Sequence, residues 1–143
     1  MEPPKADSTE GRLAVVDVLI SYAWAYDARD LAALEECFAE DATCCGYLQA
    51  ELDWGPVTGR AQIVEGLAAR MKAEPFRPRH LLSNFRFAEL TGTTAQVFSY
   101  FAVPGTQDAK TVLITAGWYL DRLVKCDGTW KLSHKEWHLD SAL

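Results

Sequence analysis

The sequence predicts an α+β fold, in which N-terminal helices pack on one face of a strongly curved, mixed or antiparallel sheet. Two observations indicate this fold: helical patterns fill the first half of the chain, and strand-like segments separated by turns fill the second half. Helices followed by a run of strands are typical of α+β domains. At 143 residues the chain is long enough for one hydrophobic core and too short for two. We expect a hollow between helices and sheet, where a small ligand would bind.

The first predicted helix covers residues 9–26, where apolar residues recur at spacings of three and four. Ser8 is its expected N-cap. The polar, proline-containing start predicts a disordered lead over residues 1–8, so a single domain is expected over residues 9–143. That segment also lacks the basic start and the apolar stretch of a secretion signal, which favours a cytoplasmic protein.

Two more helices and one strand are predicted before the middle of the chain. Asp30 is placed to cap a second helix from Leu31 to about Phe38, which has an apolar stripe. A short apolar segment over residues 42–48 predicts a strand, and Asp53-Trp54-Gly55-Pro56 after it is turn-like. The stripe of apolar residues over residues 60–72 predicts the third helix.

The second half of the chain is predicted to be an antiparallel run of strands. The strand candidates are residues 79–89, 94–103, 111–125 and 129–139. Turn residues separate them at Thr91-Gly92, Pro104-Gly105 and Cys126-Asp127-Gly128. The Asp-Gly pair is a strong signal for a tight hairpin.

Charge and hydropathy exclude two classes of partner. The formal net charge is −6, and binding to nucleic acid phosphates requires a basic surface. No apolar run approaches the ~18 residues that a membrane-spanning helix needs. We therefore expect neither nucleic acid nor membrane as a partner.

Neither a metal nor a cofactor is expected from the motifs. The sequence has no CxxC, GxGxxG or GxxxxGK[ST] pattern. His134 and His138, on one strand, would stand about 13 Å apart, which is too far to share an ion. The four cysteines are expected to be buried, reduced thiols: Cys37, Cys44, Cys45 and Cys126.

Several segments together resemble one family. Residues 22–31 read Tyr-Ala-Trp-Ala-Tyr-Asp-Ala-Arg-Asp-Leu, residues 79–84 read Arg-His-Leu-Leu-Ser-Asn, and residues 117–121 read Gly-Trp-Tyr-Leu-Asp. They are similar to the first helix, the His-x-x-x-Asn strand and the closing hairpin of SnoaL-like proteins. These proteins belong to the nuclear transport factor 2-like superfamily, so the resemblance implies a cone-shaped α+β barrel around a pocket.

The resemblance also implies an acid–base pair, Asp27 with His80. Two branches are similar here, the scytalone dehydratases and the hexachlorocyclohexane dehydrochlorinases. Tyr26, Asp27, Tyr47 and His80 resemble pocket residues of the dehydratases, and Asp27 with His80 resembles the proton-abstracting dyad of the dehydrochlorinases. Such a pair is chemically sensible, since an aspartate that holds one ring nitrogen of histidine fixes the tautomer and stabilises the imidazolium.

Five other residues are predicted to contact a substrate. The second catalytic histidine of the dehydratases is absent, and Tyr100 or Phe101 occupies its place in our alignment. Tyr119 stands near the position of a pocket asparagine. Asn84 shares a strand face with His80 if side chains alternate. Trp54, next to Gly55-Pro56, is a candidate lid on a loop.

The resemblance favours a cofactor-independent lyase or isomerase that acts on a hydrophobic small molecule such as a polyketide or terpenoid intermediate. The alternative is a non-catalytic module that binds a small ligand or serves assembly, because half of the polar dehydratase pocket is missing. A third option of the same fold is the small subunit of a ring-hydroxylating dioxygenase. A homodimer is also expected from the resemblance, through outer sheet residues such as Trp118 or Trp137.

Overall fold

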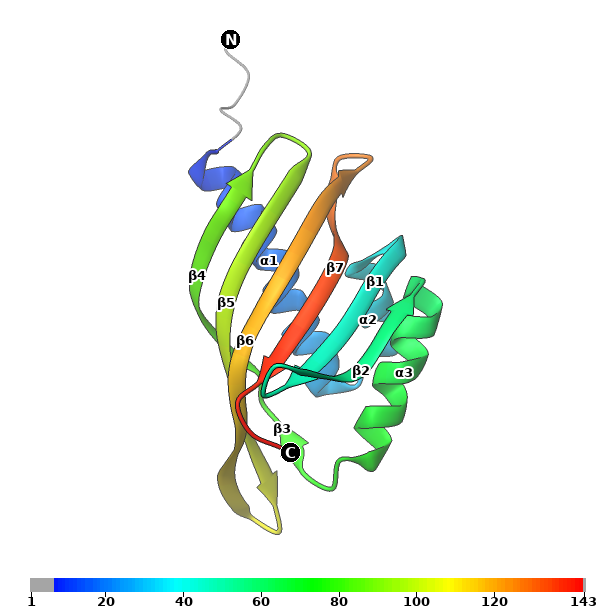
Figure 1. Ribbon diagram of the computed structural model, residues 1–143, viewed down its shortest axis with the longest axis vertical. Coiled ribbons are helices and arrows are strands. Elements are labelled where there is room, and N and C mark those ends of the chain that lie inside the picture. The colour runs from blue at the N-terminus through cyan, green and yellow to red at the C-terminus, as the bar shows by residue number, and fades with distance from the viewer. Residues whose placement is uncertain (1–6, 143) are drawn as a thin grey trace.

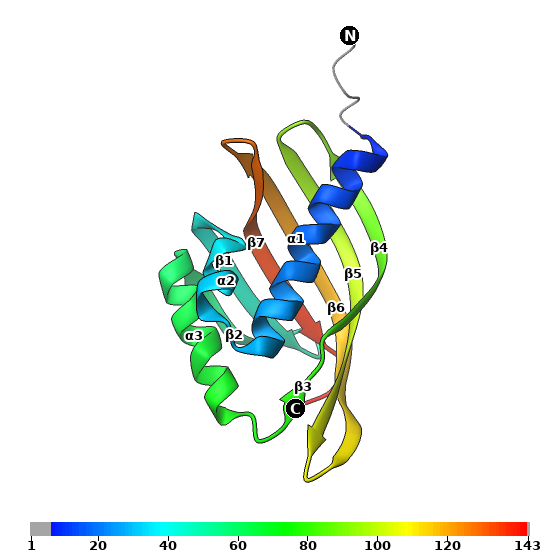
Figure 2. The same cartoon turned by 180° about the vertical axis from the view of Figure 1, so that it is seen from behind.

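In the computed structural model, which describes residues 7–142, three helices cover one face of a seven-stranded mixed sheet (Figures 1 and 2). The helices are α1 (Thr9–Ala28), α2 (Leu31–Glu36) and α3 (Arg60–Ala73). The strands are β1 (Phe38–Leu48), β2 (Glu51–Thr58), β3 (Arg77–Pro78), β4 (Leu81–Leu90), β5 (Thr94–Gln107), β6 (Lys110–Cys126) and β7 (Thr129–Leu139). The predicted α+β fold is confirmed. Most of the predicted lead, residues 1–6, lies outside the described residues.

The sheet curves around the helices without closing into a complete barrel. Its order is β2-β1-β7-β6-β5-β3, with β4 also paired to β5. Neighbouring strands are antiparallel except β1 and β7, which run parallel. Figure 2 shows α1 lying across the concave face, with α2 and α3 on the β1–β2 side. Within residues 7–142, no helix has both the length and the apolar character needed to cross a membrane.

The caps of the first two helices form as predicted. The Ser8 hydroxyl accepts a hydrogen bond from the backbone N–H of Gly11, and the Asp30 carboxylate accepts one from Ala33. The second helix is shorter than predicted, because it ends at Glu36 and Phe38 already begins β1. Phe38 is completely buried in that strand. An apolar residue at this position satisfies helix and strand patterns equally, so periodicity alone could not separate them.

Both predicted proline–glycine turns are wrong, because the residues lie inside strands. Gly55-Pro56 belongs to β2, an edge strand where a proline without an N–H is tolerated. Pro104-Gly105 lies in β5, at a register shift between Val103 and Pro104 that accommodates the proline. The true turns fall at Gln49-Ala50 and Asp108-Ala109, where all four residues have positive φ. The predicted Asp127-Gly128 hairpin turn is confirmed, with φ of 49° and 80°.

Side chains on the two faces of the sheet have different surroundings. Cys44 packs in the core, whereas its neighbour Cys45 points to the outer face beside Glu136. Trp137 is 5% exposed and belongs to the core, so it cannot contribute to a dimer contact on the outer face. Trp118 does lie on the outer face, stacked on His138. The homodimer itself stays a prediction.

Candidate active site

A cavity lies between the helices and the concave face of the sheet. Its volume is about 40 Å³, which is room for a few water molecules. The polar groups around it come from Tyr22, Tyr26, Arg70, Glu74, His80, Thr115 and Tyr119. Its apolar wall is formed by Leu67, Phe76, Phe101, Val103, Trp137 and Leu139. Because the three tyrosines present mostly ring carbon, aromatic and aliphatic side chains make up most of the wall. A smaller set of polar groups converges on the cavity, as in small-molecule sites.

Asp27 holds His80 through two hydrogen bonds. His80 Nδ1 lies 2.6 Å from Asp27 Oδ1, and the backbone N–H of His80 donates to Asp27 Oδ2 over 2.8 Å. The side chains of His80 and Asp27 are 12% and 14% exposed. An ionised carboxylate can only accept, so the ring proton resides on Nδ1. The other ring nitrogen, Nε2, has no hydrogen-bond partner among residues 7–142, and it is left as a proton acceptor.

The backbone explains how these two residues meet. Asp27 is in the last turn of α1, which ends at Arg29 with a left-handed φ of 55°. His80 stands in the break between β3 and β4, because the strand predicted over residues 79–89 begins only at Leu81. Because residues 79 and 80 are not part of the sheet ladder, the N–H of His80 is available for the Asp27 carboxylate.

Tyr26 packs against the histidine ring. The two ring centroids are 4.7 Å apart with the planes at 63°, and the Tyr26 hydroxyl donates to Glu74 Oε1 over 2.7 Å. Burial, and then the Glu74 carboxylate, raise the pKa of Tyr26 above its ordinary value of 10.0, while Arg70 opposes this shift. The hydroxyl therefore stays protonated. It fixes Glu74, whose second oxygen, Oε2, is buried without a partner within residues 7–142.

Arg70 brings a positive charge to the cavity wall. Its guanidinium carbon lies 5.1 Å from the centroid of the Trp137 ring. In the part of the chain that the structure describes, Arg70 forms no ion pair, although Glu74 follows it by one helical turn. A cation on an apolar wall is a suitable partner for an anion or for negative charge that develops during a reaction.

A family model for the SnoaL-like domain matches residues 7–136. The chain belongs to the SnoaL-like family. This family includes polyketide cyclases and dehydratases. A search of curated protein sequences gave no significant match.

Solved structures with the same fold support this assignment. A Nostoc punctiforme protein of unknown function with a cystatin-like fold superposes with a TM-score of 0.81 at 20% identity, covering 95% of this chain and 96% of that one. A Novosphingobium aromaticivorans protein provisionally assigned as a scytalone dehydratase gives 0.72 at 25% identity, covering 92% and 88%. ActVI-ORFA from Streptomyces coelicolor gives 0.75 at 18% identity, covering 90% and 97%. At the two lower identities the similarity shows the fold alone.

Five of the residues predicted for the site of this SnoaL-like domain line the cavity or contact it. Tyr26, His80, Phe101 and Tyr119 line the cavity directly, and Asp27 contacts it through His80. Phe101 and Tyr119 stack with centroids 4.2 Å apart.

Three predicted residues lie on the outer face of the SnoaL-like domain instead. Tyr47 stacks on His138 at 4.6 Å, and Tyr100 is 59% exposed because its neighbour Phe101 is the residue that points inward. Asn84 is exposed because it has a φ of 55° at a register shift in β4. That bulge breaks the alternation on which the prediction for Asn84 rested.

Trp54 does not lie on a loop, so the prediction of a lid is wrong. It belongs to β2, and its ring centroid lies 5.0 Å from that of Trp137. A side chain added at Gly66 of α3 would meet the Trp54 ring at 2.6 Å. Trp54 therefore packs between strand and helix, one layer behind the cavity wall.

Beneath the cavity of the SnoaL-like domain lies an ion pair that the sequence analysis missed. Lys135 Nζ is 3.0 Å from Asp121 Oδ1, and both side chains are 0% exposed. The ammonium also lies 3.6 Å from the ring centroid of Tyr119 and 4.2 Å from that of Tyr22. Asp121 alternates with the inward residues of the predicted strand 111–125, so its burial could have been anticipated. Lys135 could not, because irregular pairing in β7 shifts it inward.

Proposed function

We propose that this protein is a cofactor-independent lyase or isomerase that acts on a hydrophobic small molecule through Asp27 and His80. One observation carries the proposal: Asp27 occupies both Nδ1 and the backbone N–H of His80, and this leaves Nε2 as a base at a mainly apolar cavity. General bases need this combination of a fixed tautomer and a free nitrogen.

In the proposed reaction, His80 Nε2 takes a proton from a carbon atom next to a carbonyl group, and the C–H electron pair becomes an enolate. Asp27 stabilises the resulting imidazolium. In a dehydration, the β-hydroxyl group then leaves as water after taking that proton from His80. In an isomerisation, the proton returns to another carbon of the conjugated system. His80 is regenerated in either case.

The other polar groups of the cavity suit the charge that this reaction develops. Protonated phenols and cations stabilise an enolate oxygen when they are already in place. Tyr22 and Tyr119 are protonated, since burial raises the pKa of each well above its ordinary value. Arg70 adds the positive charge. A ring-sized substrate exceeds the present cavity of about 40 Å³, so its entry requires part of the wall to move outward.

A panel of four compound classes tests the proposed function: a β-hydroxy ketone, a Δ5-ketosteroid, a polyhalogenated cyclohexane and an epoxide. We expect turnover of at least one of the first three, followed by absorbance or by gas chromatography of the products. The first two assign dehydration and isomerisation through an enolate. The polyhalogenated cyclohexane assigns elimination of HX without an enolate: His80 takes the proton, the C–H electron pair forms a C=C bond, and halide leaves from the neighbouring carbon. Turnover of the epoxide alone would contradict the proposal, because hydrolysis requires an activated water rather than carbon deprotonation.

A second candidate function is a non-catalytic module that binds a small ligand. One observation favours it: of the three histidines, only His80 lines the cavity, because His134 and His138 lie on the outer face. A position for a second acid or base is thus filled by the apolar Phe101. Saturable binding of a panel compound by calorimetry, without turnover of any of them, would support this candidate over the enzyme.

Arg70 provides a further prediction for the enzyme. Arg70→Gln removes the charge expected to face the enolate, so kcat should fall by about 10²-fold, as after loss of an oxyanion donor. Arg60→Gln is the matched control on the same helix, because Arg60 pairs with Glu35 at the surface over 3.7 Å. Steady-state kinetics on the compound that is turned over provide the measurement. Equal kcat values for the two variants would exclude a role for Arg70 in stabilising the enolate.

A further inference from the structure

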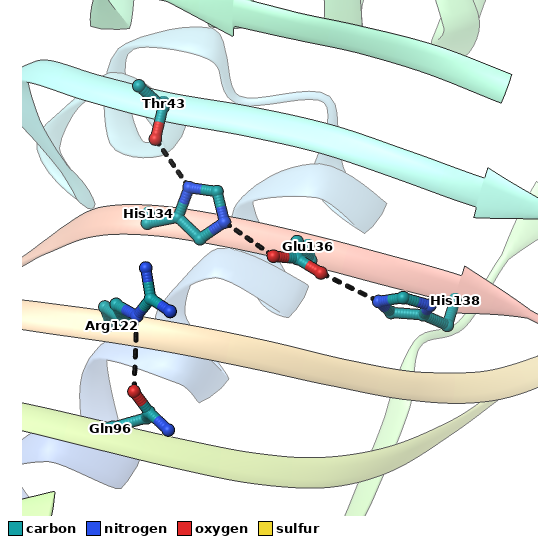
Figure 3. A network of polar contacts seen from close by, with 6 residues as sticks. All are labelled: Thr43, Gln96, Arg122, His134, Glu136 and His138. Atoms are coloured by element: carbon teal, nitrogen blue, oxygen red, sulfur yellow. Dashed lines mark hydrogen bonds and ion pairs between the residues drawn. The ribbon is translucent and has the colours of Figure 1, made fainter. Parts of the chain in front are cut away.

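The outer face of the sheet carries a second cluster of reactive side chains, remote from the cavity. Strands β1 and β7 run parallel there, and alternate residues stand opposite each other: Thr43 with His134, Cys45 with Glu136, and Tyr47 with His138. Figure 3 shows the histidines and Glu136 in a row along β7, with Thr43 reaching across from β1. The proposed reaction uses none of these residues.

Three of these side chains offer metal ligands in one place. The Cys45 sulfur, a ring nitrogen of His134 and a carboxylate oxygen of Glu136 all lie within 4.8 Å of one another. We propose that Cys45, His134 and Glu136 bind a divalent transition-metal ion of the zinc class on this outer face. The ion takes the thiolate, His134 Nε2 and Glu136 Oε2, and its fourth position is open to water.

The ligand types and charges fit such an ion. Cysteine sulfur, histidine nitrogen and carboxylate oxygen are the three ligand types that zinc takes in proteins. A thiolate and a carboxylate together neutralise a divalent cation. Magnesium and calcium prefer sites made only of oxygen, so a thiolate and an imidazole disfavour them. Zinc bonds of about 2.0–2.3 Å place ligand atoms under about 4 Å apart. The three groups lie within 4.8 Å of one another, so they must move closer together when the ion binds.

The surrounding residues would hold these ligands in place. Thr43 Oγ1 lies 2.5 Å from His134 Nδ1, and His138 Nε2 lies 2.9 Å from Glu136 Oε1, the oxygen that the ion does not take. His134 Nε2 also lies within hydrogen-bond distance of Glu136 Oε2, at 2.9 Å. A metal replaces this bond, and the ring proton then resides on Nδ1 and is donated to Thr43. A hydroxyl both donates and accepts, so Thr43 supports either tautomer.

An ion can reach the three ligands from solvent. Cys45 is only 4% exposed, whereas the side chains of His134 and Glu136 are each 19% exposed. The sulfur thus lies at the bottom, and the other two ligands remain open on the solvent side. Sequence spacing concealed this arrangement, because the ligand beside His134 and Glu136 comes from a neighbouring strand about ninety residues earlier.

A cobalt titration of the full chain tests the proposal, with Co²⁺ as a coloured substitute for Zn²⁺. We expect one equivalent to bind per chain, with a thiolate-to-cobalt charge-transfer band in the near ultraviolet, and Zn²⁺ to displace it. Cys45→Ser should abolish the band. Cys126→Ser is the matched control, since Cys126 is an exposed free cysteine in the β6–β7 hairpin, and this variant should keep the band. His138→Gln should weaken binding by about 10- to 100-fold, because His138 holds the Glu136 carboxylate in place and loss of such a contact has this effect at metal sites.

Three results would overturn the site: no binding of Co²⁺, binding without a thiolate band, or a band that survives in Cys45→Ser. Circular dichroism checks that each variant is folded. If Cys45→Ser does not fold, Glu136→Gln decides instead, because it keeps the shape of the side chain and removes the charge. Glu136→Gln should weaken Co²⁺ binding by at least about tenfold, and unchanged affinity would reject the proposal.

Discussion

Replacing His80 with alanine is expected to lower kcat by about 10²–10⁴-fold, because the variant has no base at the cavity. Asp27→Asn should cause a comparable loss for a different reason. An asparagine side chain can donate its amide N–H to His80 Nδ1, which favours the tautomer with the proton on Nε2. That tautomer cannot accept a proton from the substrate. The measurement is kcat for each variant on the panel compound that the wild-type protein turns over.

Controls separate catalysis from folding in these variants. Asp17→Asn changes an exposed carboxylate on the same helix as Asp27, and its kcat should equal that of the wild type. Thermal melting followed by circular dichroism is needed for Asp27→Asn, because Asp27 also accepts the backbone N–H of His80. A folded His80→Ala variant with more than about a tenth of the wild-type activity would exclude His80 as the base.

Local patterns were sufficient for much of the fold. The spacing of apolar residues, the caps Ser8 and Asp30, and the Asp127-Gly128 hairpin each act over a few residues, and all three appear in the structure. Predictions that relied on strict alternation were less successful. Asn84 changes face because a bulge with positive φ interrupts β4. Lys135 faces inward for a related reason, since β7 also pairs irregularly.

The candidate site required information that no local pattern contains. Asp27 and His80 are separated by 53 residues, and only the resemblance to SnoaL-like proteins brought them together before the structure. Arg70 and Glu74 were missed because charged residues in the last turns of an amphipathic helix usually face solvent. They line the cavity here because α3 packs on the β1–β2 side of the sheet (Figure 2).

Lys135→Met is expected to destabilise the protein by about 3–5 kcal/mol, the cost of leaving one partner of a buried ion pair alone. Without the lysine, Asp121 has lost its hydrogen-bond donor and its opposite charge. Lys131→Met is the control on the same strand, since Lys131 pairs with the 80% exposed side chain of Glu36. It should cost no more than about 1 kcal/mol. Urea unfolding followed by tryptophan fluorescence measures both.

The pH dependence of this loss shows whether the buried charge causes it. Burial raises the pKa of Asp121 above its ordinary value of 3.8, and Lys135 opposes that shift. A raised carboxyl pKa gives a stability contribution that is complete below the unfolded pKa and is lost as the pH rises through the folded pKa. Lys135→Met removes the opposing charge, so the pKa of Asp121 in the folded variant rises further. The loss of unfolding free energy caused by Lys135→Met should therefore be larger at pH 7 than near pH 4.

Adding Asp121→Leu to Lys135→Met separates the charge from the packing. The double variant has no buried charge and has an apolar side chain at both positions, so it should recover most of the lost stability. A double variant as unstable as Lys135→Met would instead show that the loss comes from the contacts of the ammonium with the Tyr119 and Tyr22 rings and not from an unpaired carboxylate. Turnover then shows whether the Lys135 ammonium also matters for catalysis. If the ammonium positions these rings under the substrate, the restored double variant should still have a reduced kcat.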